Sequence, residues 1–355
     1  MLLDEHALQA IARGAAVLGT GGGGDPHIGL LMSLQALEVR GPATLVSIDD
    51  LPPDGLLLPC GMMGAPTVSI EKIDNGSEGR RLRDMVEDRF GRPVVALMSS
   101  EIGGSNALLP ICWASQMGLP VLDADGMGRA FPELPQVSMH VAGISPSPAF
   151  LTDERGSMLV TTAASGEWLE RIHRRVTIEM GGSSATSEYI LTVEQARTAT
   201  ILGSVSLAHR IGRTIMDAEA NPVEALIAEL KAFRLIDGKV TDVERNTTGG
   251  FVFGSAIVEG LREHAGRLLR IEIQNENLAV LEEGRVIASV PDLIAVLDSE
   301  IAEAIPTERL RYGQRVTVIA FPCHPIWRSP GGLEVAGPRA FGYDFDYEPV
   351  ESLRG

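Results

Sequence analysis

Aromatic residues are scarce in this 355-residue sequence, at 5% of the chain, whereas glycine (39 residues) and proline (21 residues) are abundant. This balance indicates many turns and an interior of small side chains, as in α/β proteins and their loops. Apolar residues make up 45% of the chain, which is enough to bury a sizeable core. The length suggests two domains.

Basic residues are too few to balance the acidic ones, because 30 lysines and arginines face 47 aspartates and glutamates, for a net charge of −17. Without a basic field to offset phosphate repulsion, neither nucleic acid nor an anionic membrane is an expected partner. The high apolar content leads us to expect a homo-oligomer.

Cysteine is rare and dispersed, at Cys60, Cys112 and Cys323, which excludes a disulfide framework and a structural zinc motif. The first residues carry acids where a signal peptide needs bases, and no apolar run approaches the length of a membrane span. These absences predict a cytoplasmic protein.

The first half of the sequence alternates apolar runs with helical patterns. The runs are ATLVSI (43–48), GLLLPC (55–60), PVVALMSS (93–100) and LPVLDADG (119–126). Continuous apolar strands separated by helices are typical of a buried parallel sheet. We therefore predict a three-layer α/β domain with a mostly parallel sheet over residues 1–165.

The second half, residues 166–355, has a β-rich pattern that predicts a barrel- or sandwich-like domain. A helical bridge at about 192–233 precedes the strands, with one long helix from 192 to about 218 and a second from 222 to 233. Asp-Gly at 237–238 and Glu-Gly at 283–284 predict hairpin turns. We expect two separate cores, with a cleft beside the glycine run described next.

The most unusual local feature is the run Gly21, Gly22, Gly23 and Gly24, which follows a predicted helix and precedes Asp25 and His27. Glycines are kept together where the backbone needs positive φ or close approach of another group. A helix before the run argues against a dinucleotide fingerprint, and no Gly-Lys-Ser/Thr follows. The run is either a cradle for a ligand, with Asp25 and His27 as titratable groups, or a tight structural turn.

Polar residues also follow the predicted strands, at the edge where ligands of open α/β sheets bind. Glu101 and Asp125 are candidate general bases, and Asn106 with the amides of Gly103 and Gly104 could bind a carbonyl or an oxyanion. The alternative is structural: acids at strand ends also serve as helix caps, as for Asp50 or Asp123, and Glu101 could be a solvated loop residue.

Three further features bear on the site. Glu71 is either a substrate-facing acid or half of an exposed pair with Lys72, and a polar cluster at 274–277 could face a cleft. The histidines lack HExxH or HxH spacing, so no cofactor is predicted. A catalytic divalent metal such as zinc, held by ligands distant in sequence, stays open as an alternative.

Five segments in order resemble the S-methyl-thiohydantoin desulfurase family, which is often found with hydantoinase-type enzymes. They are LGTGGGGDPHIG, MMGAPTVSIEKI, EIGGSNALLP, LPVLDADGMGRAFPELPQVSM and PIWRSPGGLEVAGPRAFGYDF, from Leu18 to about Asp344. The resemblance implies an N-terminal α/β domain, a C-terminal β-rich domain and hydrolytic removal of a sulfur substituent from a thiohydantoin ring.

Such a reaction needs a base to deprotonate water, donors for the developing charge and a holder for the small heterocyclic substrate. Asp125 or Glu101 could be the base and the glycine-loop amides the donors. A metal-dependent hydrolase of another cyclic amide, such as a hydantoin, is the competing hypothesis, and a covalent cysteine route is third. The last alternative is a non-catalytic partner or ligand-sensing subunit of hydantoin metabolism.

Overall fold

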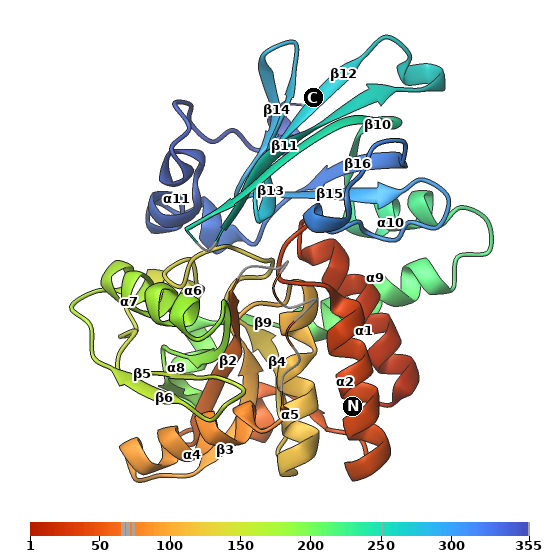
Figure 1. The fold of residues 1–355 in the computed structure, drawn as a ribbon. Helices are drawn as coiled ribbons and strands as arrows, with labels where there is room; N and C mark the ends of the chain where they lie inside the picture. Colours follow the sequence, from red (N-terminus) through yellow and green to blue (C-terminus); the bar gives the residue numbers. More distant parts are fainter. Residues whose placement is uncertain (65–67, 69–71, 73–74, 250, 354–355) are drawn as a thin grey trace.

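In the computed structural model, which describes residues 1–64, 68, 72, 75–249 and 251–353, the strands form two separate sheets (Figure 1). The predicted combination of an α/β half with a mostly parallel sheet and a β-rich half is confirmed. None of the helices in the described residues has the length and apolar content needed to cross a bilayer.

The first sheet has the strand order β1-β4-β3-β2-β7-β5-β6, with β8 paired to β2 and β9 to β4. Strands β1, β4, β3 and β2 are parallel, and the others join them antiparallel. The strands are β1 Leu45–Val46, β2 Leu56–Gly64, β3 Val94–Ser99, β4 Val121–Asp125, β5 Ala149–Thr152, β6 Met158–Thr161, β7 Ser183–Ser187, β8 Leu191–Thr192 and β9 Ile201–Leu202. The predicted division at residue 165 lies inside the stretch of chain that builds this sheet.

Helices pack along this sheet, with α4 and α5 against β2 and β3, α7 against β2 and β7, and α9 against β4. The helices of this half and of the bridge are α1 Glu5–Leu18, α2 Pro26–Arg40, α4 Glu78–Phe90, α5 Leu109–Met117, α6 Ser138–Val141, α7 Gly166–Glu179, α8 Val193–Ala199, α9 Ser204–Met216 and α10 Pro222–Leu230, with short 3-10 turns η1 Ile48–Asp50 and η2 Gly104–Ala107.

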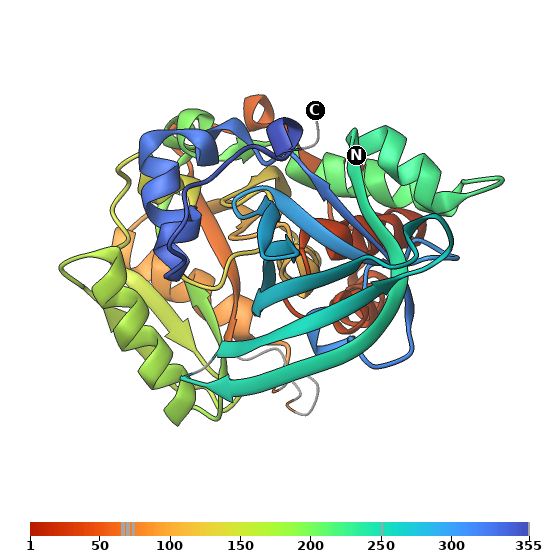
Figure 2. The same ribbon diagram turned by 90° about the horizontal axis from the view of Figure 1, so that it is seen from above.

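The second sheet is antiparallel, with the order β14-β13-β12-β11-β10-β16-β15, and it curls into an open half-barrel above the first domain (Figures 1 and 2). Its strands are β10 Phe233–Thr248, β11 Phe251–Gly260, β12 Leu268–Gln274, β13 Glu276–Glu282, β14 Arg285–Ser289, β15 Leu293–Asp298 and β16 Arg315–Phe321. The remaining helical segments are η3 Arg262–His264, η4 Thr307–Arg309, η5 Pro325–Arg328, α11 Pro330–Ala336, η6 Pro338–Phe341 and α12 Val350–Leu353.

The two faces of the curled sheet belong to different cores. Leu278, Leu293 and Phe321 join the large core of the first domain, whereas Val258 and Val318 belong to a smaller cluster of the sheet's own. The second sheet therefore has a core of its own, as predicted, but the large core of the first domain continues across the junction between the domains. That continuity fixes how the second sheet sits over the first.

The prediction of one long helix from 192 to 218 is wrong. α8 ends at Ala199, Ile201–Leu202 form β9 beside β4, and α9 begins at Ser204. The β-branched residues Thr200 and Ile201 favour an extended chain, and Gly203 has φ 79°. The side chain of Asp123 accepts a hydrogen bond from the Ser206 amide, so this strand-end acid serves the start of α9.

Of the two predicted hairpin turns, one is confirmed and one is wrong. Glu283 and Gly284 form the turn between β13 and β14, with φ values of 50° and 77°. Strand β10 instead runs straight through Asp237 and Gly238. A Cβ atom on Gly238 would lie 2.5 Å from the Glu259 carbonyl oxygen, so this glycine permits a close strand contact.

The helix α1, which leads into the glycine run, is held by a glycine-mediated crossing with α9. A Cβ atom on Gly14 would lie 1.8 Å from the carbonyl oxygen of Ala208, and one on Gly212 would lie 1.8 Å from that of Ala10. The two backbones therefore approach more closely than any side chain allows, which positions the end of α1 and the loop that follows it.

We predict that Gly14→Ala lowers the free energy of unfolding by about 1 to 3 kcal/mol, because backbone atoms must move to admit the methyl group. Denaturant unfolding measures the loss. Gly331→Ala is the control, since the added methyl there meets Val141 at an ordinary 3.5 Å. Equal stability of the two variants would show that the helix crossing tolerates a side chain.

Candidate active site

A cavity lies where the carboxyl ends of β2 and β3 meet the glycine run and the turn between β12 and β13. Both domains line it, which is the position expected for ligands of α/β proteins. Its apolar wall consists of Ile28, Met32, Met62, Met63, Leu109, Met127, Phe131 and Leu134. Its polar lining includes Asp25, Ser100, Glu101, Asn106, Glu133, Arg174, Thr186, Glu188, Asn275 and Glu276.

The glycine run divides into two pairs with different neighbours. Gly23 and Gly24 line the cavity, whereas Gly21 and Gly22 lie against the second domain. The Thr307 amide donates to the Gly21 carbonyl at 2.9 Å, and a Cβ atom on Gly22 would lie 2.0 Å from Oε1 of Glu276. The run is therefore both a wall of the cavity and the joint between the domains.

Gly103 and Gly104 interlock with the same run from the first domain. A Cβ atom on Gly23 would lie 2.3 Å from the Gly103 carbonyl oxygen, and Gly104 has φ 64°. Neither glycine lines the cavity, so their place is behind its wall. They let η2, which carries Asn106, approach the glycine run.

Glu101 lies in the cavity wall just after β3, with 8% of its surface exposed. The Asn106 side-chain amide donates to its Oε1 at 2.5 Å, while Oε2 has no partner among the described residues. Burial raises the pKa of Glu101 to about 8, and Asn106 and the Phe131 backbone oppose that shift only in part. A carboxyl group with these properties can take a proton near neutral pH.

Asn106 positions Glu101 relative to the end of β2. Its Oδ1 accepts from the Met62 amide at 2.7 Å, and its Nδ2 donates to the Met62 carbonyl at 3.2 Å as well as to Glu101. The side chain thus bonds the backbone of β2 as a neighbouring strand would. The Nδ2 group bonds Met62 and Glu101, so the predicted role of Asn106 in binding a ligand carbonyl or oxyanion stays a prediction.

A second buried carboxyl, Glu276, enters the cavity from the second domain. It is 2% exposed, and its Oε2 has no partner among the described residues. Burial first, and then the nearby Glu101, raise its pKa well above the usual value, while Arg129 opposes the shift. Glu101 and Glu276 therefore form an acid pair that cannot readily carry two negative charges.

Arg129 is a fully buried cation next to this pair. Its guanidinium donates to the carbonyls of Pro291 (2.7 Å) and Asp292 (3.0 Å) and to the Thr20 hydroxyl (3.0 Å). Burial lowers its pKa, whereas Glu276 opposes the shift most strongly among the nearby acids. Arg129 thereby ties the start of the glycine run to the second domain.

Asp125, a predicted base, does not line the cavity. It is fully buried, and its Oδ2 accepts from the amides of Ile102 (2.8 Å), Met127 (2.9 Å) and Gly128 (2.7 Å). Burial raises its pKa to about 6, and these amides oppose the shift. Asp125 therefore holds together the loops after β3 and β4 and acts as a support for Glu101.

Asp25 and His27 separate at the start of α2. Asp25 lines the cavity, but its carboxylate caps α2 by accepting from the His27 amide at 3.0 Å and forms an ion pair with Arg309. His27 is exposed and lies outside the cavity lining, because its place in the first turn of α2 directs it to solvent. The predicted convergence thus includes Asp25, Glu101 and Asn106, and leaves out His27 and Asp125.

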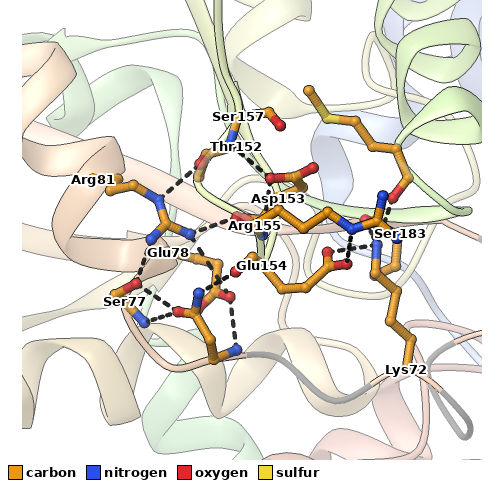
Figure 3. A network of polar contacts seen from close by, with 12 residues as sticks. Lys72, Ser77, Glu78, Arg81, Thr152, Asp153, Glu154, Arg155, Ser157 and Ser183 are labelled. Carbon is orange, nitrogen blue, oxygen red and sulfur yellow. Dashed lines mark hydrogen bonds and ion pairs between the residues drawn. The ribbon is translucent and has the colours of Figure 1, made fainter.

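Glu71 lies outside the described residues. Its neighbour Lys72 contacts the chain at the start of β7, next to Ser183 (Figure 3). The Lys72 ammonium donates to the carbonyls of Met180 (2.8 Å) and Ser183 (2.7 Å) and pairs with Glu154 at 2.8 Å. Ser183 lines the cavity, so this network fixes one side of its wall.

The sequence did not single out four residues of the site, which are Ser100, Arg129, Glu188 and Glu276. The polar cluster at 274–277 was the one signal that pointed to Glu276. In the described part of the chain, no three histidine, cysteine, aspartate or glutamate side chains are grouped to hold a metal ion. The titratable groups that line the cavity are mainly carboxyl groups, and Glu101 lies close enough to Glu276 to raise the pKa of Glu276.

Models of two consecutive domains match almost the whole sequence: the S-Me-THD-like N-terminal domain over residues 6–163 and the S-Me-THD-like C-terminal domain over residues 164–350. The fold is also similar to the crystal structure of a protein from Chromobacterium violaceum, with a TM-score of 0.83. The two sequences are 22% identical, and the comparison covers 99% of this chain and 100% of the other. No curated protein matches the sequence.

The Glu101→Gln variant tests whether burial disfavours the charged form of Glu101, because that penalty changes the free energy of unfolding with pH. Near pH 4 Glu101 is mostly protonated in both the folded and the unfolded chain, so its burial carries little penalty in the free energy of unfolding. As pH rises, the unfolded chain ionises first, and above the folded pKa of about 8 the full penalty applies. We predict that Glu101→Gln stabilises the protein by about 2 to 4 kcal/mol more at pH 8.5 than at pH 4.

Urea unfolding at the two pH values measures this difference. Glu38→Gln, on the exposed side of α2, is the control and should show no such dependence. A pH-independent effect of Glu101→Gln would mean that Glu101 ionises in the folded protein as easily as in water.

Proposed function

Because the chain belongs to the S-Me-THD-like family, we propose that it is a hydrolase that removes a sulfur substituent from a thiohydantoin-type ring. The observation that carries the proposal is the pair Glu101 and Glu276. These two buried carboxyls come from different domains, face one cavity and each keep an unpartnered oxygen.

The pair supplies a base and an acid from chemically identical groups. Two carboxyls in a shared low-dielectric site hold one proton between them, so one is ionised while the other is protonated. Glu101, with its donor Asn106, is assigned the carboxylate state, and Glu276 the protonated state. This assignment gives the reaction a proton acceptor and a proton donor at the same pH.

In the proposed step, the attacked carbon lies between two ring nitrogens and carries the sulfur substituent. Glu101 takes one proton from water as the water oxygen bonds to this carbon, and the π pair of the ring C=N bond moves onto its nitrogen. The C–S bond then breaks, its electron pair stays on sulfur, and Glu276 protonates the leaving thiol. The remaining hydroxyl proton moves to the ring nitrogen as the C=O bond forms. The carboxyl pair ends with one proton, as it began.

The rest of the cavity suits such a ring. Met62, Met63 and Met127 offer a polarisable wall for a thioether substituent. The Ser100 hydroxyl is buried without a partner among the described residues and is available to the charge that develops on the ring. Gly23 and Gly24 let the backbone approach a flat ligand.

Release of methanethiol from an S-methyl-thiohydantoin, followed with a thiol reagent, tests this function. We predict that Glu101→Gln lowers kcat by about two to four decades, the usual loss for a general base. In the unaltered protein kcat/KM should rise with pH up to about 8, because Glu101 must lose its proton to act. Glu133→Gln, a half-buried lining residue, is the control; unchanged turnover in Glu101→Gln would remove Glu101 from the reaction.

Gly22→Ala tests the position of Glu276 without altering the carboxyl itself. Gly22 does not have positive φ, so alanine fits its backbone, but the methyl group must displace the end of the Glu276 side chain. We predict at least a tenfold loss of kcat with a stability loss of about 1 to 3 kcal/mol, because the buried Glu276 side chain must shift to admit the methyl group.

The double variant Gly22→Ala with Glu276→Gln provides the decisive comparison. Both changes act on the same group, so their effects on kcat should be far from additive. Additive losses would mean that Gly22 influences turnover by another route.

A further inference from the structure

Another buried carboxyl lines the cavity and has no part in the step above. Glu188 follows the last residue of β7 and is 3% exposed. The Thr186 hydroxyl donates to its Oε2 at 2.7 Å, and the described residues form no other hydrogen bond or ion pair with it. Burial raises the pKa of Glu188 to about 7.

Two other buried acids around this cavity are paired with cations. Asp25 has Arg309, and Glu170 receives the Arg174 guanidinium at 2.7 Å. Burying a carboxyl without such a partner is costly unless another donor completes its hydrogen bonding. Glu188 therefore has an acceptor to spare on the side that faces the cavity.

The strand order places Glu188 and Glu101 on opposite sides of β2. β7 and β3 flank β2, and the Ser187 hydroxyl bonds the Pro59 carbonyl while the Ser100 amide bonds the Cys60 carbonyl. The backbones of β7 and β3 are therefore two strand spacings apart, about 10 Å. Both acids line the same cavity, so a ligand held there can meet Glu101 from one side and Glu188 from the other.

We propose that Glu188 is a specificity-determining residue that accepts a hydrogen bond from a ring N–H of the substrate, opposite the reacting side at Glu101. This assignment rests on the proposed function, because it takes the ligand to be a hydantoin-type ring. The site selects heterocycles that present an unsubstituted N–H to β7 and rejects those alkylated at that nitrogen.

The experiment is calorimetric binding of hydantoin, the ring that the proposed reaction leaves, and of its two N-methyl isomers. The unaltered protein should bind one isomer at least tenfold more weakly than hydantoin. Glu188→Gln should weaken hydantoin binding by about 10- to 100-fold, the range for losing a hydrogen bond to a charged group. Glu188→Ala should bring the ratio between hydantoin and the disfavoured isomer close to one.

Glu38→Gln is the control, because Glu38 is exposed on α2 and lies outside the cavity lining. It should leave the ratio between hydantoin and its N-methyl isomers unchanged. If both Glu188 variants bind like the unaltered protein, or if neither isomer is disfavoured by the unaltered protein, the assignment of Glu188 is overturned.

Thiol release separates this proposal from the proposed function. If hydantoin binding depends on Glu188 but no thiol is released, the proposed desulfurising activity is overturned and the proposed N–H subsite stands. Thiol release without dependence of binding on Glu188 would do the reverse. Absence of hydantoin binding in the unaltered protein would overturn the assignment of Glu188, and thiol release would then decide the proposed function by itself.

Discussion

The buried guanidinium of Arg129 is the interaction on which the two-domain site depends. A cation removed from water needs hydrogen-bond acceptors and an opposite charge inside the protein. Arg129 finds them in the Thr20 hydroxyl, in the carbonyls of Pro291 and Asp292, and in the nearby acid pair. Moving the second domain away would break these bonds and leave the charge unpaired, so the position of the cavity and the burial of Arg129 are coupled.

The same junction explains why the site is rich in glycine. Gly22 makes room for Glu276, and Gly23 and Gly104 bring two loops of the first domain into backbone contact. Each close approach shortens the distance between carboxyls that would repel one another if both were charged. The proton that Glu101 and Glu276 must share is thus a consequence of packing, and the resulting loss of stability at high pH accompanies the proposed chemistry.

Local patterns in the sequence were sufficient for much of the fold. Apolar runs marked β2, β3 and β4, and the glycine run marked the end of α1. The break between α8 and α9 was missed because Ile201–Leu202 become a strand only by pairing with β4. Glu276 could not be assigned from sequence, because its role depends on the burial and neighbours that the second domain creates.

Asp125 and Glu101 show what separates a supporting acid from a reactive one. Asp125 ends β4, Glu101 follows β3, and both are buried, so their positions in the sequence do not distinguish them. Three backbone amides converge on one oxygen of Asp125, which lies behind the cavity wall, whereas Glu101 receives the Asn106 side-chain amide and lines the cavity. Backbone amides are fixed donors, so they stabilise the carboxylate form of Asp125 more than its protonated form. Asp125 is therefore suited to remain ionised and to hold the loops together. Glu101, with fewer fixed donors, is suited to exchange its proton.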